Sequence, residues 1–263
     1  MIINRSFKEF KLQHRSKKNQ IIYSSKKVQS DKEILNLIEN FLIEKNSFIF
    51  ESVEKGKIKG RYTIFGKNPD KIWEFNNNNS FLIKNNKKVK LKEKPQILIE
   101  NIIEDFKFKI PSGLPSISSL ISGYFSYDTI RYIENIPNKC KDDLRVPDVR
   151  LLRPRTLVIH DNLKKKIFYI VNIFKDEKIS NYSKKYLGIK SELSELFAQS
   201  LEAKDNTNNK KKLAKIKVKS NTSKNKFLSM VNKAKKYIKI GDIFQVVLSQ
   251  RFETKLTKKP LDI

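Results

Sequence analysis

The sequence predicts an α+β protein, in which an antiparallel, sheet-rich (sandwich-like) N-terminal domain with flanking helices precedes the first helix and strand of an incomplete second domain. Short runs rich in Ile, Phe and Tyr, broken by Gly, Asn and Pro, fill residues 47–91, and this punctuation is typical of antiparallel strands. Apolar residues recur at helical spacing before and after these runs. A polar, charged stretch at residues 203–220, which predicts a linker, separates a last helix and strand from the rest.

The first predicted helix covers residues 30–42. Residues 1–29 hold only short apolar runs, whereas Ser30 and Glu33 have the spacing of a capping box. In such a box the serine hydroxyl accepts a hydrogen bond from the N3 amide, and the glutamate reaches back to the cap. Apolar residues at helical spacing follow from Ile34 to Leu42, so a helix is expected there.

The next elements are predicted to be strands joined by tight turns. The runs that predict them are residues 47–53, 60–66, 70–75, 81–84 and 87–91. Asparagines at 76–79 and 85–86 separate the last three, and asparagine tolerates the left-handed backbone of tight turns. Pro95 then begins a second helix, because proline is favoured at the first helical position. Its apolar face reaches Phe106, and Pro111 is expected to end it.

Three further strands and a long helix follow. The strands are predicted at residues 119–126, 156–161 and 166–174, and the helix at residues 181–201. Because proline cannot donate a ladder hydrogen bond, three prolines between the first two strands predict an irregular connection. These are Pro137, Pro147 and Pro154.

After the charged linker, Thr222 or Ser223 caps a helix that Gly241 ends in the left-handed conformation. A strand over residues 242–252 is expected next. Its apolar face consists of Phe244, Val246, Leu248 and Phe252. The predicted boundaries are therefore 1–175 for the N-terminal domain, 176–220 for a helix and linker, and 221–263 for the start of the second domain.

The strong positive charge favours genome composition over a binding function. The chain of 263 residues has a formal net charge of +28, from 56 Lys+Arg against 28 Asp+Glu. Only nine of the basic residues are Arg, and the Lys lie along the whole chain beside abundant Asn and Ile, as an AT-rich coding sequence produces. A Lys-rich nucleic-acid-binding module therefore stays as a remote alternative, which a steep salt dependence of DNA or RNA affinity would indicate.

Composition and motifs exclude several other classes. One cysteine, Cys140, excludes an internal disulfide framework and a Cys-based zinc finger, and two histidines exclude a His-rich metal site. The chain lacks an apolar run of membrane-spanning length and a signal-peptide core, which predicts a cytoplasmic protein without a membrane partner. Phosphate-loop, dinucleotide-binding, nucleophile-elbow and HExxH motifs do not occur.

Three longer blocks resemble anthranilate synthase component I, the chorismate-using subunit. The first block covers residues 48–66, where Phe-Glu-Ser precedes Gly-Arg-Tyr. The second, at residues 123–137, has Gly-Tyr, Tyr-Asp and Arg in the family's order. The third begins with Ser220-Asn-Thr and continues through residues 234–252, and it is similar to the entry into the chorismate-binding domain. The blocks occur in the family's order over about residues 30–260, so together they identify the family far more firmly than any one alone.

The resemblance implies a regulatory site in the first block, where the family's end product L-tryptophan binds and inhibits. Ser52 matches the serine that contacts tryptophan. Glu51 and Arg61 would supply charges for the ammonium and carboxylate groups of the ligand. For these two, an ion pair with each other on the sheet surface is an equally open interpretation.

Gln245 in the third block points to amination. Members of the family that add water to chorismate are similar but carry a lysine base there, whereas amine-using members have glutamine; Gln245 would line the active site. In the second block Ser126 replaces the family's usual glycine. We therefore expect the local backbone conformation at this position to differ from that of the family.

By this resemblance, the family reaction converts chorismate and ammonia to anthranilate and pyruvate with Mg²⁺. A glutamine amidotransferase subunit supplies the ammonia. The resemblance also implies that the chorismate and Mg²⁺ ligands lie downstream, so that this chain is an N-terminal part without catalytic residues of its own. The aminodeoxychorismate synthase large subunit, which shares the architecture, stays as the alternative.

Overall fold

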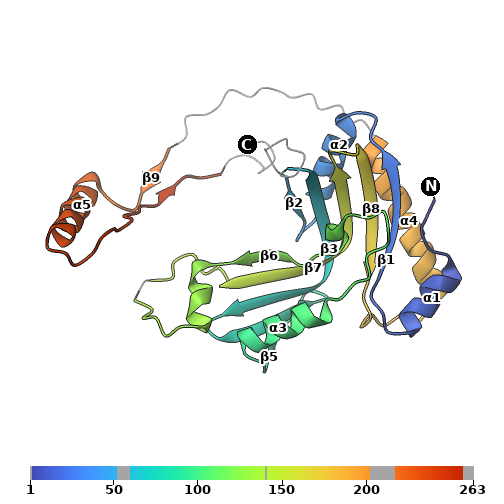
Figure 1. The fold of residues 1–263 in the computed structure, drawn as a ribbon, viewed down its shortest axis with the longest axis horizontal. Helices are drawn as coiled ribbons and strands as arrows, with labels where there is room; N and C mark the ends of the chain where they lie inside the picture. Colours follow the sequence, from blue (N-terminus) through green and yellow to red (C-terminus); the bar gives the residue numbers. More distant parts are fainter. Residues whose placement is uncertain (1, 52–59, 140, 202–216, 257–263) are drawn as a thin grey trace. The chain divides into compact units, whose positions relative to one another are not determined.

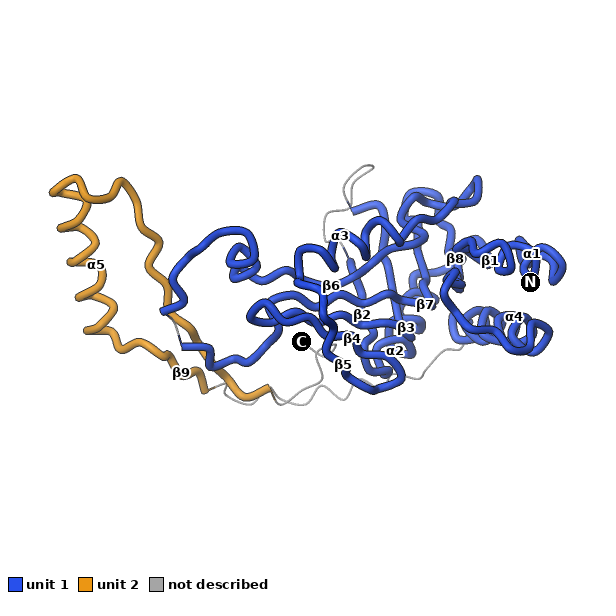
Figure 2. The backbone as a smooth tube through the Cα atoms, turned by 90° about the horizontal axis from the view of Figure 1, so that it is seen from below, with its two compact units in different colours: residues 1–204 blue, residues 205–263 orange. Residues whose placement is uncertain are grey.

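The computed structural model describes residues 2–51, 60–139, 141–201 and 217–256. Ser52 and Cys140, on which two of the interpretations above depend, lie outside these residues. The chain divides into two compact units, Met1–Lys204 (unit 1) and Asp205–Ile263 (unit 2) (Figure 2). No helix in the described part of the chain is long and apolar enough to cross a membrane.

Unit 1 is built on one antiparallel sheet of eight strands (Figure 1). Its main path is β1 (Gln20–Lys27), β8 (Lys166–Ile173), β7 (Val149–Asp161), β3 (Tyr62–Asn76), β4 (Asn79–Lys84) and β5 (Lys87–Leu91). In addition, β2 (Phe48–Phe50) pairs with β3, and β6 (Ser122–Phe125) pairs with β7. The sheet and its flanking helices confirm the predicted α+β class.

The two long strands β3 and β7 run through both halves of the sheet, which point in different directions in Figure 1. Where the halves meet, Pro69 lies opposite Pro154, and the register shifts between Pro69 and Lys71. Two prolines facing each other remove ladder hydrogen bonds at this point, which permits the bend. The prediction of separate strands at 60–66 and 70–75 was therefore wrong, as was the irregular connection through Pro154, because a bulge carries each strand past its proline.

Three helices pack on one face of the first half of the sheet: α1 (Phe7–Arg15), α2 (Lys32–Phe41) and α4 (Tyr182–Leu201). In α4 the buried side chains Ile189, Leu193 and Leu196 recur at helical spacing and meet Phe65, Val158 and other side chains of the strands. The opposite face of this half is covered by the segment 106–121. Helix α3 (Pro95–Asp105) packs on the second half, around Trp73 and Phe75.

The first 29 residues hold two elements that the sequence analysis missed. Helix α1 begins with a capping box, in which the Ser6 hydroxyl accepts from the N–H of Glu9 at 3.3 Å and the Glu9 carboxylate accepts from the N–H of Ser6 at 2.7 Å. Strand β1 then pairs with β8 over its whole length. The box predicted at α2 is not formed: Ser30 makes no side-chain cap, and Glu33 accepts from the N–H of Gln29 and pairs with Lys26 at 2.6 Å.

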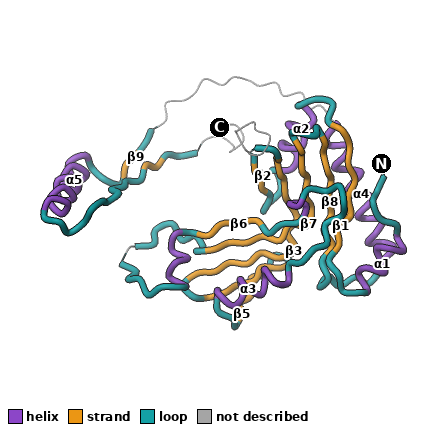
Figure 3. The backbone as a smooth tube through the Cα atoms, in the orientation of Figure 1, coloured by secondary structure: helices purple, strands orange, loops and turns teal. Residues whose placement is uncertain are grey.

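Unit 2 consists of a helix and a short strand pair: α5 (Lys224–Lys239), β9 (Lys219–Ser220) and β10 (Phe252–Glu253). Ser223 caps α5 as predicted, and Gly241 follows it with φ of 83°. The strand predicted over 242–252 is wrong except at its end, and Figure 3 shows the segment before β10 as a loop. No strand in the described part of the chain pairs with residues 242–251, and an unpaired segment has no ladder to hold it extended.

Candidate functional site

Two of the three residues predicted to contact tryptophan lie at one end of a strand pair. Glu51 follows β2 directly, and Arg61 precedes β3 directly. Because β2 and β3 are antiparallel, with Phe50 opposite Ile64, both residues lie at the same end of the pair. Ser52 belongs to the connection that the structure does not describe. Glu51 is exposed and makes no ion pair with a described residue.

Arg61 pairs with Asp161. The alternative prediction, an ion pair between Arg61 and Glu51, is therefore wrong. The Nε and Nη2 atoms of Arg61 donate to the two carboxylate oxygens of Asp161 at 3.1 and 2.7 Å, and its guanidinium lies 4.8 Å from the centre of the Tyr62 ring. This bidentate geometry is the strong form of an arginine–carboxylate pair. It joins the start of β3 to the end of β7.

Asp161 is almost fully buried, and its carboxylate is well supplied with donors. Burial by itself raises the pKa of Asp161, but the hydrogen bonds from Arg61 and from the N–H groups of Lys164 and Leu163 outweigh it and hold the pKa below its ordinary value. The same pair raises the pKa of Arg61. The site therefore keeps a fixed anion and cation side by side, with Nη1 of Arg61 not used in the pair.

Strand β2 carries two aromatic rings in the residues just before Glu51. The rings of Phe48 and Phe50 are 4.9 Å apart, and Phe48 packs directly on Gly66 of β3. A Cβ atom at position 66 would lie 2.2 Å from Cζ of Phe48, so only glycine admits this ring. Phe50 is 47% exposed. A charged end and an apolar wall together suit a ligand with an ionic group and a large apolar side chain.

The second block forms a compact structural turn. A Cβ atom at Gly123 would lie 1.9 Å from the carbonyl oxygen of Arg150, so the close pairing of β6 with β7 requires glycine. Arg131 donates to Asp128 at 2.8 Å and to the carbonyls of Ile136 and Pro137. These contacts lie within one segment. The glycine, aspartate and arginine of the second block are therefore explained by the structure that they stabilise.

Ser126 adopts φ of −71° and ψ of 167°, an extended conformation open to any residue. The serine in place of glycine therefore costs no backbone strain. Nearby, Tyr132 donates to Asp148 at 2.8 Å, and burial together with this carboxylate raises the pKa of the tyrosine far above its ordinary value.

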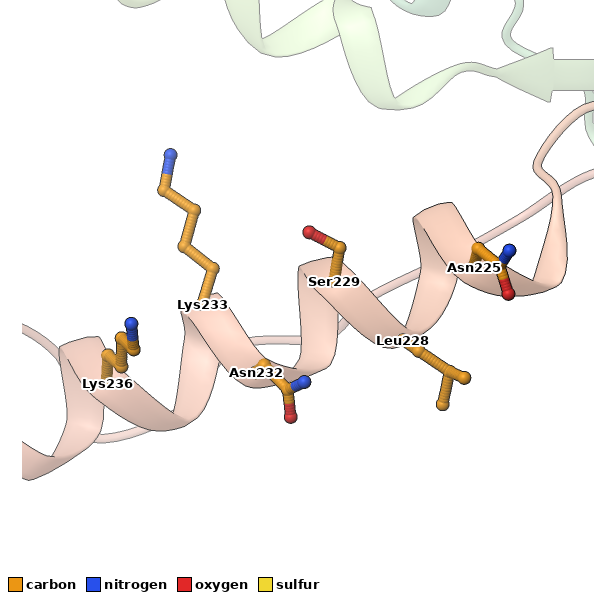
Figure 4. A pocket seen from close by; sticks show the side chains of 6 residues that line it. All are labelled: Asn225, Leu228, Ser229, Asn232, Lys233 and Lys236. Atoms are coloured by element: carbon orange, nitrogen blue, oxygen red, sulfur yellow. The ribbon is translucent and has the colours of Figure 1, made fainter.

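The third block places no catalytic group among the described residues. Gln245 is exposed in the loop after α5. A depression of about 480 Å³ lies along α5, and Figure 4 shows that its lining side chains all project from this one helix. It has no opposing wall in the described part of the chain, so it does not form a closed substrate pocket.

The residues present do not fit a Mg²⁺ site. No group of three or more His, Cys, Asp or Glu side chains comes together within the described ranges, whereas Mg²⁺ requires oxygen ligands that converge. His160 is buried within β7, and burial lowers its pKa. His14 is buried against the Tyr182 hydroxyl at 2.9 Å. Neither belongs to a nucleophile–base arrangement.

Sequence reasoning missed Asp161 as the partner of Arg61. The two residues are 100 positions apart, and the sequence indicates Asp161 only as the end of a predicted strand. The strand register brings them together, and no local pattern reports it.

The sequence of this chain is similar to those of known proteins of one family. The family model "chorismate binding enzyme" matches residues 45–263. Anthranilate synthase component 1 of Acetivibrio thermocellus is 34% identical over 251 residues, 92% of this chain and 50% of that protein. The Cereibacter sphaeroides protein of the same name is 28% identical over 94% of this chain and 50% of its own length.

A crystal structure of anthranilate synthase component I from Streptococcus pneumoniae superposes with a TM-score of 0.63 at 25% identity, covering 80% of this chain and 46% of that one. The chain thus spans about half the length of the relatives that it matches.

Proposed function

The chain belongs to the chorismate binding enzyme family, and we propose that it is the N-terminal part of an anthranilate synthase component I. The observation that carries the proposal is the 34% identity with such a component over 92% of this chain. The complete protein would be a cytoplasmic enzyme that converts chorismate and ammonia to anthranilate and pyruvate in tryptophan biosynthesis. A glutamine amidotransferase subunit would supply the ammonia.

Within this proposal, unit 1 has the regulatory role and unit 2 begins the catalytic part. The sheet of unit 1 carries its own core on both faces, whereas the described residues of unit 2 bring no acid, base or metal ligands together. The family chemistry uses Mg²⁺, and the described residues do not bring ligands for this ion together.

The effector site would be the end of the β2–β3 pair. Glu51 is exposed and available for the ammonium group of tryptophan, and Nη1 of Arg61 is left for its carboxylate while Asp161 holds the guanidinium in place. The rings of Phe48 and Phe50 would face the indole. Ser52 would add a hydrogen bond to the ligand.

Activity tests the first part of the proposal. The 263-residue chain alone should form no fluorescent anthranilate from chorismate, NH₄⁺ and Mg²⁺. The same chain joined at Ile263 to the remaining half of the Acetivibrio relative should form it. A folded joined protein that consumes chorismate without producing anthranilate would contradict the proposed reaction.

The substitution Ser52→Ala in the joined, active protein tests the effector site. A charge-assisted hydrogen bond lost only from the tryptophan complex should raise the half-inhibiting concentration about tenfold and leave the chorismate KM unchanged. Ser47→Ala, the same change five residues earlier, is the matched control, since Ser47 bonds only the carbonyl of Glu44. Identical inhibition curves for wild type and Ser52→Ala would remove Ser52 from the site.

A further inference from the structure

A second, unassigned groove lies in unit 1 at the beginning of α4, away from the β2–β3 end. Its volume is about 570 Å³, and it is lined by the segment between β8 and α4, by the first turns of α4 and by Arg155 of β7. Ile179 gives it an apolar part, and the remaining accessible lining is mostly polar. The site and the family assignment above do not use any of these residues.

The groove carries an excess of positive charge. Its cationic side chains are Arg155, Lys178, Lys184 and Lys185, and Glu192 is its acidic one. Behind them Glu177 accepts from Arg155 at 3.3 Å and from Lys185. Four cations against two carboxylates leave two positive charges without compensation. Lys178 and Lys184 account for them, because neither makes an ion pair with any residue that the structure describes.

Arg155 has an unused donor. Its Nε atom is buried and has no hydrogen-bond partner among the described residues. A buried N–H of a charged group without an acceptor is costly, and such groups ordinarily find a partner. Because Nε is itself shielded from solvent, a ligand in the groove meets the positive charge of this guanidinium rather than its Nε donor. Glu177 holds that charge in place through Nη1.

Gly188 opens the floor of the groove. It lies in the interior of α4, where glycine weakens a helix. A Cβ atom there would meet nothing within 4 Å, so no close packing within unit 1 requires the glycine. The missing side chain keeps the groove open between the basic residues and Glu192.

We propose that this groove binds the phosphate group of a small phosphorylated ligand, with the apolar part of the ligand against Ile179. A phosphate monoester carries about −1.5 to −2 charges at pH 7 and three terminal acceptor oxygens. It therefore matches the two uncompensated charges of the groove, whereas a single carboxylate brings one charge and two oxygens. Lys178 and Lys184 bind the oxygens through mobile ammonium groups, and the guanidinium of Arg155 adds a positive charge of fixed position.

The test measures binding of inorganic phosphate to the full 263-residue chain by calorimetry in chloride buffer, with acetate as the carboxylate probe. Wild type should bind phosphate more tightly than acetate. The double variant Lys178→Gln/Lys184→Gln should weaken phosphate binding about fivefold, since each exposed charge contributes modestly. The control Lys164→Gln/Lys190→Gln has the same net charge as the first double variant. Its affinity for phosphate should stay within twofold of the wild-type affinity.

A second variant separates a built groove from a diffuse basic surface. Gly188→Leu keeps every charge and fills the floor, so it should abolish phosphate binding while the protein melts at the same or a higher temperature. Absence of phosphate binding to wild type at millimolar concentrations, equal weakening in both double variants, or tighter binding of acetate would each overturn the proposal.

Discussion

The two units bury their apolar side chains to very different extents, although both have amphipathic helices. In unit 1 three apolar clusters pack against the sheet. In the described part of unit 2, Ala234 is the only buried apolar residue. Leu193 of α4 is fully buried, whereas Leu228 of α5 is 51% exposed. The comparison teaches that an amphipathic pattern with good caps makes a helix, but that a core needs a second apolar surface to meet it.

The largest expected effect compares these two leucines directly. Leu193→Ala removes buried volume from the core of unit 1 and should lower the free energy of unfolding by about 2–5 kcal/mol. Leu228→Ala removes an exposed side chain and should change it by less than about 0.5 kcal/mol. Urea unfolding followed by circular dichroism measures both. Equal losses would mean that α5 contributes to a shared core.

The next effect concerns the Arg61–Asp161 pair, which closes one end of the sheet of unit 1. Arg61→Gln leaves a buried carboxylate with only its backbone donors and should lower the free energy of unfolding at pH 7, by less than Leu193→Ala does. Because the pKa of Asp161 is lowered in the folded protein, the contribution of the pair is present above the unfolded pKa and is lost as pH falls through the folded value. The difference in the free energy of unfolding between wild type and variant should therefore shrink below about pH 4. A gap that does not change with pH would show that lost packing, not charge, explains the effect.

Helix caps give a smaller and more local test. Ser6→Ala should lower the stability of unit 1 by about 1 kcal/mol, because its hydroxyl caps α1 in a complete box. Ser30→Ala should have almost no effect, since the Ser30 hydroxyl caps nothing.

Ser223→Ala supplies the contrast in unit 2. It should reduce the helix content of α5 without moving the unfolding transition of unit 1. A shift of the main transition by Ser223→Ala would break the distinction between the units.

The smallest effect is expected at Asp176, near the bend of the sheet, because its carboxylate is 36% exposed and solvent screens its ion pairs. Burial raises its pKa, but Lys71 at 2.5 Å and Arg153 at 2.9 Å together lower it to about 2. Its contribution to stability is thus complete above about pH 4 and is lost between pH 4 and pH 2. Asp176→Asn should lower Tm at pH 6. At pH 2 the Tm of the variant should approach that of the wild type. Glu104→Gln, an exposed change of equal charge on α3, should follow the wild-type curve throughout.

Elements with strong local signals could be predicted from the sequence. Pro95 begins α3, Ser223 and Gly241 bound α5, and the asparagine turns occur where expected, with Asn77 and Asn78 at φ of 47° and 61°. These residues restrict their own backbone, so no distant partner is needed to find them.

Features that depend on distant pairing could not be predicted. Residues 149–155 of β7 contain four charged or proline interruptions, and they form a strand because β3 and β6 lie beside them. The segment 242–251 has the better strand pattern and forms none, because no partner is available among the described residues. The pairing of Arg61 with Asp161 and the groove at α4 depend on the same long-range register, which leaves no mark in the local sequence.

Native-state hydrogen exchange, read by mass spectrometry on the 263-residue chain, tests the central contrast most directly. Amides of β7 and β8 in unit 1 should exchange only through global unfolding. Amides of α5 should exchange orders of magnitude faster, since a helix of 16 residues without a core is marginal in water. Protection of α5 equal to that of β8 would show that unit 2 packs into the same cooperative core and would contradict the distinction between the two units.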